Sequence, residues 1–92
     1  MTEAEKLIST MLEITGASKD DFFNSRSYPL AYARAIVANE LRIRGYLWKD
    51  ISVIMNKSHS NLITMISSLD RVLELKTYKE VKELYNEFQS KK

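Results

Sequence analysis

Residues 56–61, with the sequence NKSHSN, place polar side chains without negative charge immediately before an apolar run at helical spacing. Such side chains are costly to bury, so we expect the segment to face something outside the protein. Hydroxyl, amide, imidazole and ammonium groups can hydrogen-bond to base edges and phosphates, and none of them repels a phosphate. The segment therefore indicates nucleic-acid contact, and the candidate contacts are Lys57, Ser58, His59, Ser60, Asn61 and Thr64.

Positive charge is concentrated in the middle of the chain, although the whole sequence has a net charge of only +2. Residues 1–21 carry a net charge of −3, residues 22–69 carry +4 and residues 70–92 carry +1. A central basic stretch is typical of a phosphate-binding surface. Its basic residues, which we take as further candidate contacts, are Arg26, Arg34, Arg42, Arg44, Lys49 and Lys57.

Each candidate also has a simpler interpretation. His59 could be an exposed residue in the first turn of a helix, and Ser58 has the type and position of an N-cap, a role that is compatible with DNA contact. The arginines and lysines could be solvated charges or ion-pair partners. The aromatic side chains could stack on single-stranded nucleic acid, but packing at the core is the better interpretation; they are Tyr28, Tyr32, Tyr46 and Trp48.

Helical patterns position these residues. Apolar spacing and end signals predict helical segments over residues 2–16, 18–23, 27–45, 48–55, 58–75 and 77–89. The expected end signals are the N-caps Ser18, Ser58 and Thr77, the first-turn Pro29, and the terminating residues Gly16, Gly45 and Asn56. The expected core stripes are Leu7, Met11, Leu12 and Ile14; Leu30, Ala33, Val37 and Leu41; Ile51, Ile54 and Met55; Leu62, Ile66, Leu69, Val72 and Leu73; and Val81, Leu84, Tyr85 and Phe88.

The segments 48–55 and 58–75 together describe a helix-turn-helix, because a short helix is followed after a few residues by a longer one. In that motif the second helix presents its first turns to a DNA groove, so those turns should carry no carboxylate. Ser60, Thr64, Ser67 and Arg71 form such an acid-free stripe. We therefore expect residues 1–92 to form one domain, a small all-α bundle that contains a helix-turn-helix.

The chain resembles the C-terminal DNA-binding domain of the bacterial replication initiator DnaA, a helical domain with a Trp-repressor-like helix-turn-helix. The resemblance rests on ARAIVANEL (33–41), DISVIM (50–55) and NKSHSNLI (56–63), and it extends from about residue 5 to about residue 84. The last segment stands where the family has a Gly-Gly-Arg-Asp-His-Thr-Thr-Val signature. The resemblance implies that the helix over 58–75 enters the major groove and that Arg34 reaches into the minor groove.

The chain also departs from this family. Of the polar residues in the signature only His59 is kept; Lys57 replaces the Arg, Ser58 the Asp, and Ser60 and Asn61 the two Thr. Loss of the Asp removes an acceptor for a cytosine amino group, so we expect a sequence preference that differs from the DnaA box. The sequence has no Gly-rich phosphate-binding loop, so we do not expect the ATP-driven assembly that the family's AAA+ module supports.

Composition argues against several other classes. The sequence has no cysteine and a single histidine without clustered acidic residues, which offers neither a catalytic triad nor a metal site. We therefore expect no enzymatic activity and no cofactor. No apolar run approaches the length of a membrane span, and the N-terminal residues do not resemble a signal peptide, which predicts a cytoplasmic, nucleoid-associated protein without a membrane partner.

The sequence thus predicts specific binding of double-stranded DNA, in replication control or in a bacterial phage or mobile-element process. The alternative is a protein-interaction module that keeps the DnaA-like scaffold and binds a replication or packaging protein. Loss of most of the signature residues favours this alternative, whereas the central positive charge favours DNA.

Overall fold

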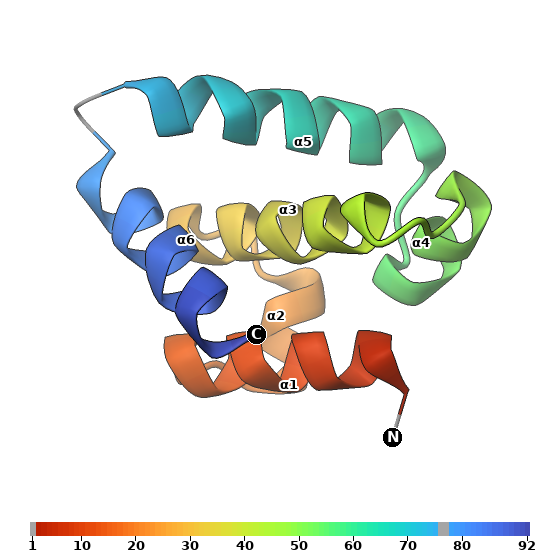
Figure 1. The fold of residues 1–92 in the computed structure, drawn as a ribbon, viewed down its shortest axis with the longest axis horizontal. Coiled ribbons are helices and arrows are strands. Elements are labelled where there is room, and N and C mark those ends of the chain that lie inside the picture. Colours follow the sequence, from red (N-terminus) through yellow and green to blue (C-terminus); the bar gives the residue numbers. More distant parts are fainter. Residues whose placement is uncertain (1, 76–77) are drawn as a thin grey trace.

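The computed structural model describes residues 2–75 and 78–92, and within these ranges the chain forms helices and no strands (Figure 1). The helices are α1 (Glu3–Thr15), α2 (Lys19–Asn24), α3 (Tyr28–Ile43), α4 (Trp48–Met55), α5 (His59–Glu74) and α6 (Lys79–Lys91). Their buried apolar side chains form one cluster. The predicted all-α bundle is confirmed, and each predicted segment corresponds to one of these helices.

Local signals set most of the helix ends. Gly16 and Asn56 follow α1 and α4 in the left-handed conformation, with φ of 71° and 54°, which Gly and Asn adopt more readily than other residues. The hydroxyls of Ser18 and Ser58 accept hydrogen bonds from backbone N–H groups in the first turns of α2 and α5. These four predicted end signals are confirmed.

Other boundaries shift by a few residues. Helix α3 ends at Ile43, and Gly45 lies beyond it with φ of 95°. Helix α6 continues to Lys91 rather than residue 89, and the predicted N-cap Thr77 lies outside the described residues.

Within residues 2–75 and 78–92, no helix combines the length and the hydropathy needed to cross a membrane.

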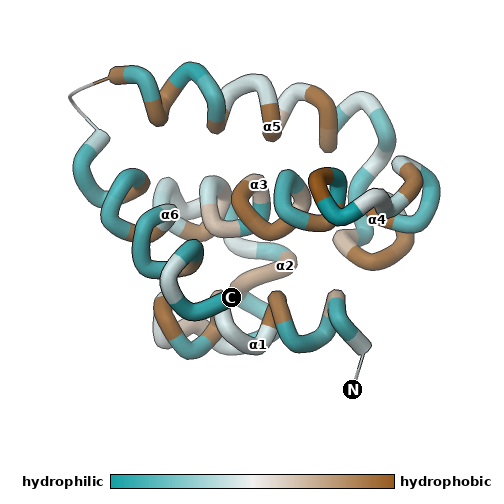
Figure 2. The backbone as a smooth tube through the Cα atoms, in the orientation of Figure 1, coloured by the Kyte–Doolittle hydropathy of each residue, from teal (hydrophilic) through white to brown (hydrophobic). Residues whose placement is uncertain are grey.

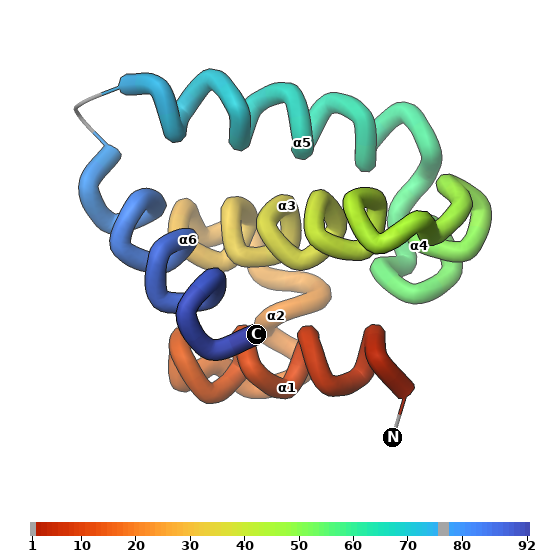
Figure 3. Tube along the Cα trace, in the orientation of Figure 1, coloured from red at the N-terminus to blue at the C-terminus, as the bar shows by residue number. Residues whose placement is uncertain are grey.

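Helix α3 lies at the centre of the bundle and packs against every other helix of the described chain (Figures 1 and 3). Because neighbours cover it on several sides, it is buried around most of its circumference rather than along one stripe. The buried apolar side chains include the predicted Ala33, Val37 and Leu41 and the unpredicted Ala35, Ile36 and Ala38, whereas the predicted Leu30 is half-buried. The alanines let the surrounding helices approach the α3 backbone closely.

The apolar side of α5 faces α3, and its hydrophilic side faces away from the bundle (Figure 2). Leu62, Leu69 and Val72 are buried, while Ile66 and Leu73 are half-buried against the core. The remaining predicted stripes are also found, with Leu7, Met11, Ile51, Met55, Val81 and Phe88 buried and Leu12, Ile14, Ile54, Leu84 and Tyr85 packed partly buried at the edge. Burial of these stripes positions the polar face of α5 toward solvent.

A buried carboxylate connects α3 to the C-terminal helix. Glu40 is 4% exposed, and its two carboxylate oxygens accept hydrogen bonds from Lys92 Nζ at 2.7 Å and Arg44 Nε at 2.8 Å. Arg44 also lies 3.5 Å from the carboxylate of Glu3 on α1. Burial alone would raise the pKa of the Glu40 carboxyl, but the two cationic donors outweigh it and hold the pKa below its ordinary value.

Candidate nucleic-acid interface

The turn between α4 and α5 is held by hydrogen bonds from both sides. Asn56 reverses the chain direction in its left-handed conformation, and the next backbone N–H, that of Lys57, donates to the carbonyl of Ser52 at 3.2 Å. The Ser52 hydroxyl donates in return to the carbonyl of Lys57. Ser58 then caps α5, accepting from the backbone N–H of Asn61 at 3.3 Å. These contacts determine the direction in which α5 leaves the turn.

The first turns of α5 present the predicted polar face to solvent. His59, Ser60, Asn61 and Thr64 are all exposed, and the first turn carries no acidic residue. The Thr64 hydroxyl donates to the Ser60 carbonyl at 3.0 Å, which leaves its oxygen able to accept from an outside donor. The N-terminal end of α5 is also the positive end of its helix dipole, which favours negatively charged groups. The surface therefore offers hydrogen-bonding groups in a positive environment.

Trp48 supports the start of α5 from the side. Its ring stacks on the His59 imidazole with centroids 5.3 Å apart and planes 27° apart. The Arg42 guanidinium lies 4.8 Å from the Trp48 ring centroid and donates to the Tyr46 carbonyl at 2.9 Å. The end of α3 and the beginnings of α4 and α5 meet through these side chains. The sequence predicted Trp48 as a packing residue, but it did not predict its pairing with His59.

The remaining basic candidates have different surroundings. Lys49, in the first turn of α4 beside Trp48, is exposed, and so is Arg26 in the segment between α2 and α3. Lys57 is half-buried at the turn. Arg44 instead forms ion pairs with Glu40 and Glu3, so its charge is already balanced within the bundle. Lys49, Arg42 and Lys57 therefore lie in or beside the α4–α5 unit, whereas Arg44 belongs to the α1–α3–α6 side.

Arg34 is buried, which the sequence did not predict. Only 7% of its surface is exposed, and its guanidinium Nη1 donates a hydrogen bond to the backbone carbonyl of Phe22 at 2.7 Å. The reach of Arg34 into a minor groove, which the resemblance implied, is not found in this conformation, because α3 is central and the guanidinium is held against α2. Burial lowers the pKa of Arg34 from its ordinary value. In this conformation Arg34 is part of the interior and does not project into a groove of DNA.

Comparisons of the chain with models of known protein families, with curated proteins and with solved structures gave no significant match. Within residues 2–75 and 78–92, His, Asp and Glu side chains do not gather into a group of three that could hold a metal ion. The functional interpretation of the α4–α5 surface therefore depends on the residues and contacts described above.

Proposed function

We propose that this chain is a double-stranded DNA-binding module in which α4 and α5 act as a helix-turn-helix and α5 occupies the major groove. The observation that carries the proposal is the exposed, acid-free polar face at the start of α5, held in place by the capped turn and by Trp48. His59, Ser60, Asn61 and Thr64 would contact bases. Amide, hydroxyl and imidazole groups on one helix face can distinguish base pairs through their donors and acceptors.

The surrounding cations would contact the phosphates. Lys57 and Lys49 lie next to the N-terminal ends of α5 and α4, where backbone N–H groups also favour anions. Arg42 lies against the Trp48 ring and is a further candidate for phosphate contact. Arg26, exposed between α2 and α3, is a candidate outside the α4–α5 unit. Arg34 and Arg44 are left out of the proposed interface, since one is buried and the other is ion-paired.

The resemblance to the DnaA C-terminal domain supports the same function and favours a role in replication control or in a phage or mobile-element process. The altered turn residues favour a different target sequence from that of the family. A single module of this size buries little surface on DNA, so we expect modest affinity that rises steeply as salt is lowered.

Salt-dependent binding tests the proposal directly. Fluorescence anisotropy with a labelled duplex should give a linear fall of log K with log salt, and Lys57→Gln should reduce the slope by about 0.9 if Lys57 neutralises one phosphate. Lys6→Gln on α1, which removes an exposed lysine far along the chain from α5, should leave the slope unchanged. Absence of salt-dependent binding would refute the proposal.

The second candidate function is binding to a replication or packaging protein. It is favoured by exposed apolar side chains between the end of α3 and α4: Ile43, the last residue of α3, is 67% exposed, Leu47 just before α4 is 55% exposed and Val53 within α4 is 82% exposed. Val53→Ser separates the two functions, because it would weaken an apolar protein contact at this residue without removing any group that we assign to DNA and without adding a negative charge one helical turn from Lys49. Unchanged DNA binding by this variant is expected under the DNA proposal.

A further inference from the structure

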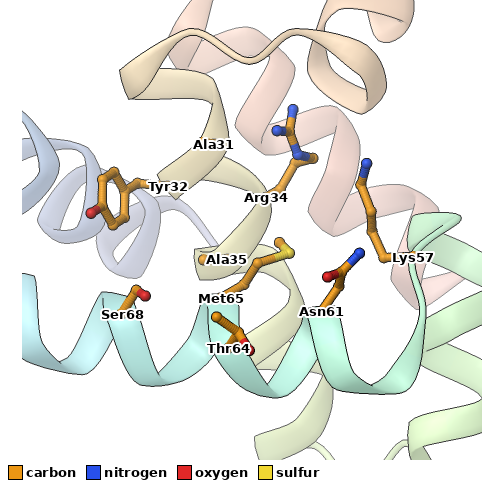
Figure 4. A pocket seen from close by; sticks show the side chains of 9 residues that line it. All are labelled: Ala31, Tyr32, Arg34, Ala35, Lys57, Asn61, Thr64, Met65 and Ser68. Carbon is orange, nitrogen blue, oxygen red and sulfur yellow. The ribbon is translucent and has the colours of Figure 1, made fainter.

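A groove with a volume of about 360 Å³ lies between α3 and α5, lined on one side by Tyr32, Arg34 and Ala35 and on the other by Asn61, Met65 and Ser68 (Figure 4). Lys57 joins it from the turn before α5. This volume lies at the lower end of the range for small-molecule sites. The groove could therefore hold a molecule of roughly a dozen non-hydrogen atoms, provided that its chemistry matches the walls.

The two ends of the groove differ in chemistry. In Figure 4, Arg34, Lys57 and Asn61 lie toward one end, and Tyr32 and Ser68 lie toward the other. Met65 and Ala35 lie between them and provide an apolar middle. Both charged residues of the lining are cations, and the lining contains no carboxylate. The walls thus suit a molecule with an anionic group at one end and an apolar body.

Arg34 gives an independent reason to expect an anion. It forms no ion pair within residues 2–75 and 78–92, although only 7% of it is exposed. Its Nη1 donates to the Phe22 carbonyl, but its buried Nε has no hydrogen-bond partner among the described residues. A buried charge that lacks a counter-charge is costly, and native proteins rarely leave such a group uncompensated. A bound anion would offset this cost.

We propose that the α3–α5 groove binds a small organic anion, a carboxylate or a phosphate monoester, whose charged group lies near Arg34, Lys57 and Asn61. Its apolar body lies along Met65 and Ala35 toward Tyr32. Carboxylate and phosphate share the acceptor geometry that a guanidinium and an ammonium group recognise. The size of the groove and its apolar middle favour an organic anion over a bare inorganic ion.

Binding can be measured by titrating the ¹⁵N-labelled protein with three probes of similar size and following backbone amide shifts. The probes are 3-phenylpropionate, phenyl phosphate and the neutral 3-phenylpropionamide. We expect saturable shifts at Asn61, Met65 and Ser68, with at least one anion binding about tenfold more tightly than the amide, as one charge-assisted hydrogen bond predicts. The tighter of the two anions identifies the headgroup.

Two variants and a control locate the site. Lys57→Gln should weaken anion binding about tenfold, and Ser68→Phe should abolish it by filling the end near Tyr32. Lys6→Gln should change nothing, because Lys6 lies on α1 outside the groove lining. The proposal is overturned if neither anion binds below about 10 mM, if the amide binds equally well, or if the shifts in folded Ser68→Phe match those of the unmodified protein.

The groove also bears on DNA binding, and this step rests on the proposed function. Asn61 and Thr64 line the groove and also belong to the proposed base-reading face. The probe that binds should therefore change the affinity for duplex DNA in the anisotropy assay at constant ionic strength. Probe binding without any DNA binding would contradict the DNA proposal alone, whereas DNA binding without probe binding would contradict the groove proposal alone.

Discussion

Replacement of Glu40 by Gln tests the packing that fixes α3 and α6. The carboxylate is 4% exposed and accepts one hydrogen bond from Lys92 and one from Arg44. A hydrogen bond to a charged group contributes about 1.5–3 kcal/mol to stability. The Gln amide keeps one oxygen that can accept a hydrogen bond. The side chains of Lys92 and Arg44 are 25% and 29% exposed, so hydrogen bonds to water offset part of the lost stability. We expect Glu40→Gln to lower the free energy of unfolding by about 2 kcal/mol and the Tm by roughly 10 °C.

The difference in stability between the Glu40→Gln variant and the unmodified protein should depend on pH. The folded-state pKa of Glu40 lies below the ordinary value of 4.5, so its contribution is fully present above that value and disappears as the pH falls through the folded-state pKa. Urea unfolding at pH 7 and at several values below 4.5 should show a stability difference between the two proteins that shrinks with acid. Glu13→Gln, at an exposed carboxylate of α1 outside the ion pairs described, is the control. An equal difference at pH 7 and pH 3, or no difference at pH 7, would refute the reasoning.

Two further predictions concern the start of α5. Ser58→Ala removes the N-cap acceptor and should cost about 1 kcal/mol in urea unfolding, whereas Ser58→Gly should cost only a few tenths; equal losses would argue against the cap. Trp48→Leu removes both the stack on His59 and the contact with Arg42 and should cost about 1–2 kcal/mol. In the same variant the His59 ring-proton resonances should lose the ring-current shift that Trp48 causes, and unchanged resonances would contradict the stacked geometry.

Helix positions could be predicted from the sequence because they depend on neighbouring residues. Gly16 and Asn56 end their helices through their own backbone preferences, and Ser58 caps α5 by reaching only three residues ahead. The turn and the exposed face of α5 follow from these local signals. The apolar stripes likewise follow from helical spacing.

Long-range features could not be predicted in this way. The burial of Arg34 depends on the Phe22 carbonyl, which α2 brings to it from twelve residues earlier in the chain. The burial of the middle of α3 around most of its circumference depends on how the other helices surround it, and a one-sided periodic pattern contains no information about that arrangement. The contact between Trp48 and His59 depends in the same way on how α4 and α5 cross. The exposure of the polar residues at the start of α5 could thus be predicted from the sequence, whereas the stacking of Trp48 on His59 and the burial of Arg34 required the tertiary structure.

Selection of bound sites from a random duplex pool is the measurement that tests the proposed base recognition by α5 most directly. The unmodified protein should enrich one sequence motif, and Asn61→Ala should bind that motif about 1–3 kcal/mol more weakly while losing little affinity for random DNA. Asn86→Ala, at an exposed asparagine of α6, should enrich the same motif as the unmodified protein. No enrichment by the unmodified protein, or the same motif with the same affinity for Asn61→Ala, would contradict recognition of DNA by α5.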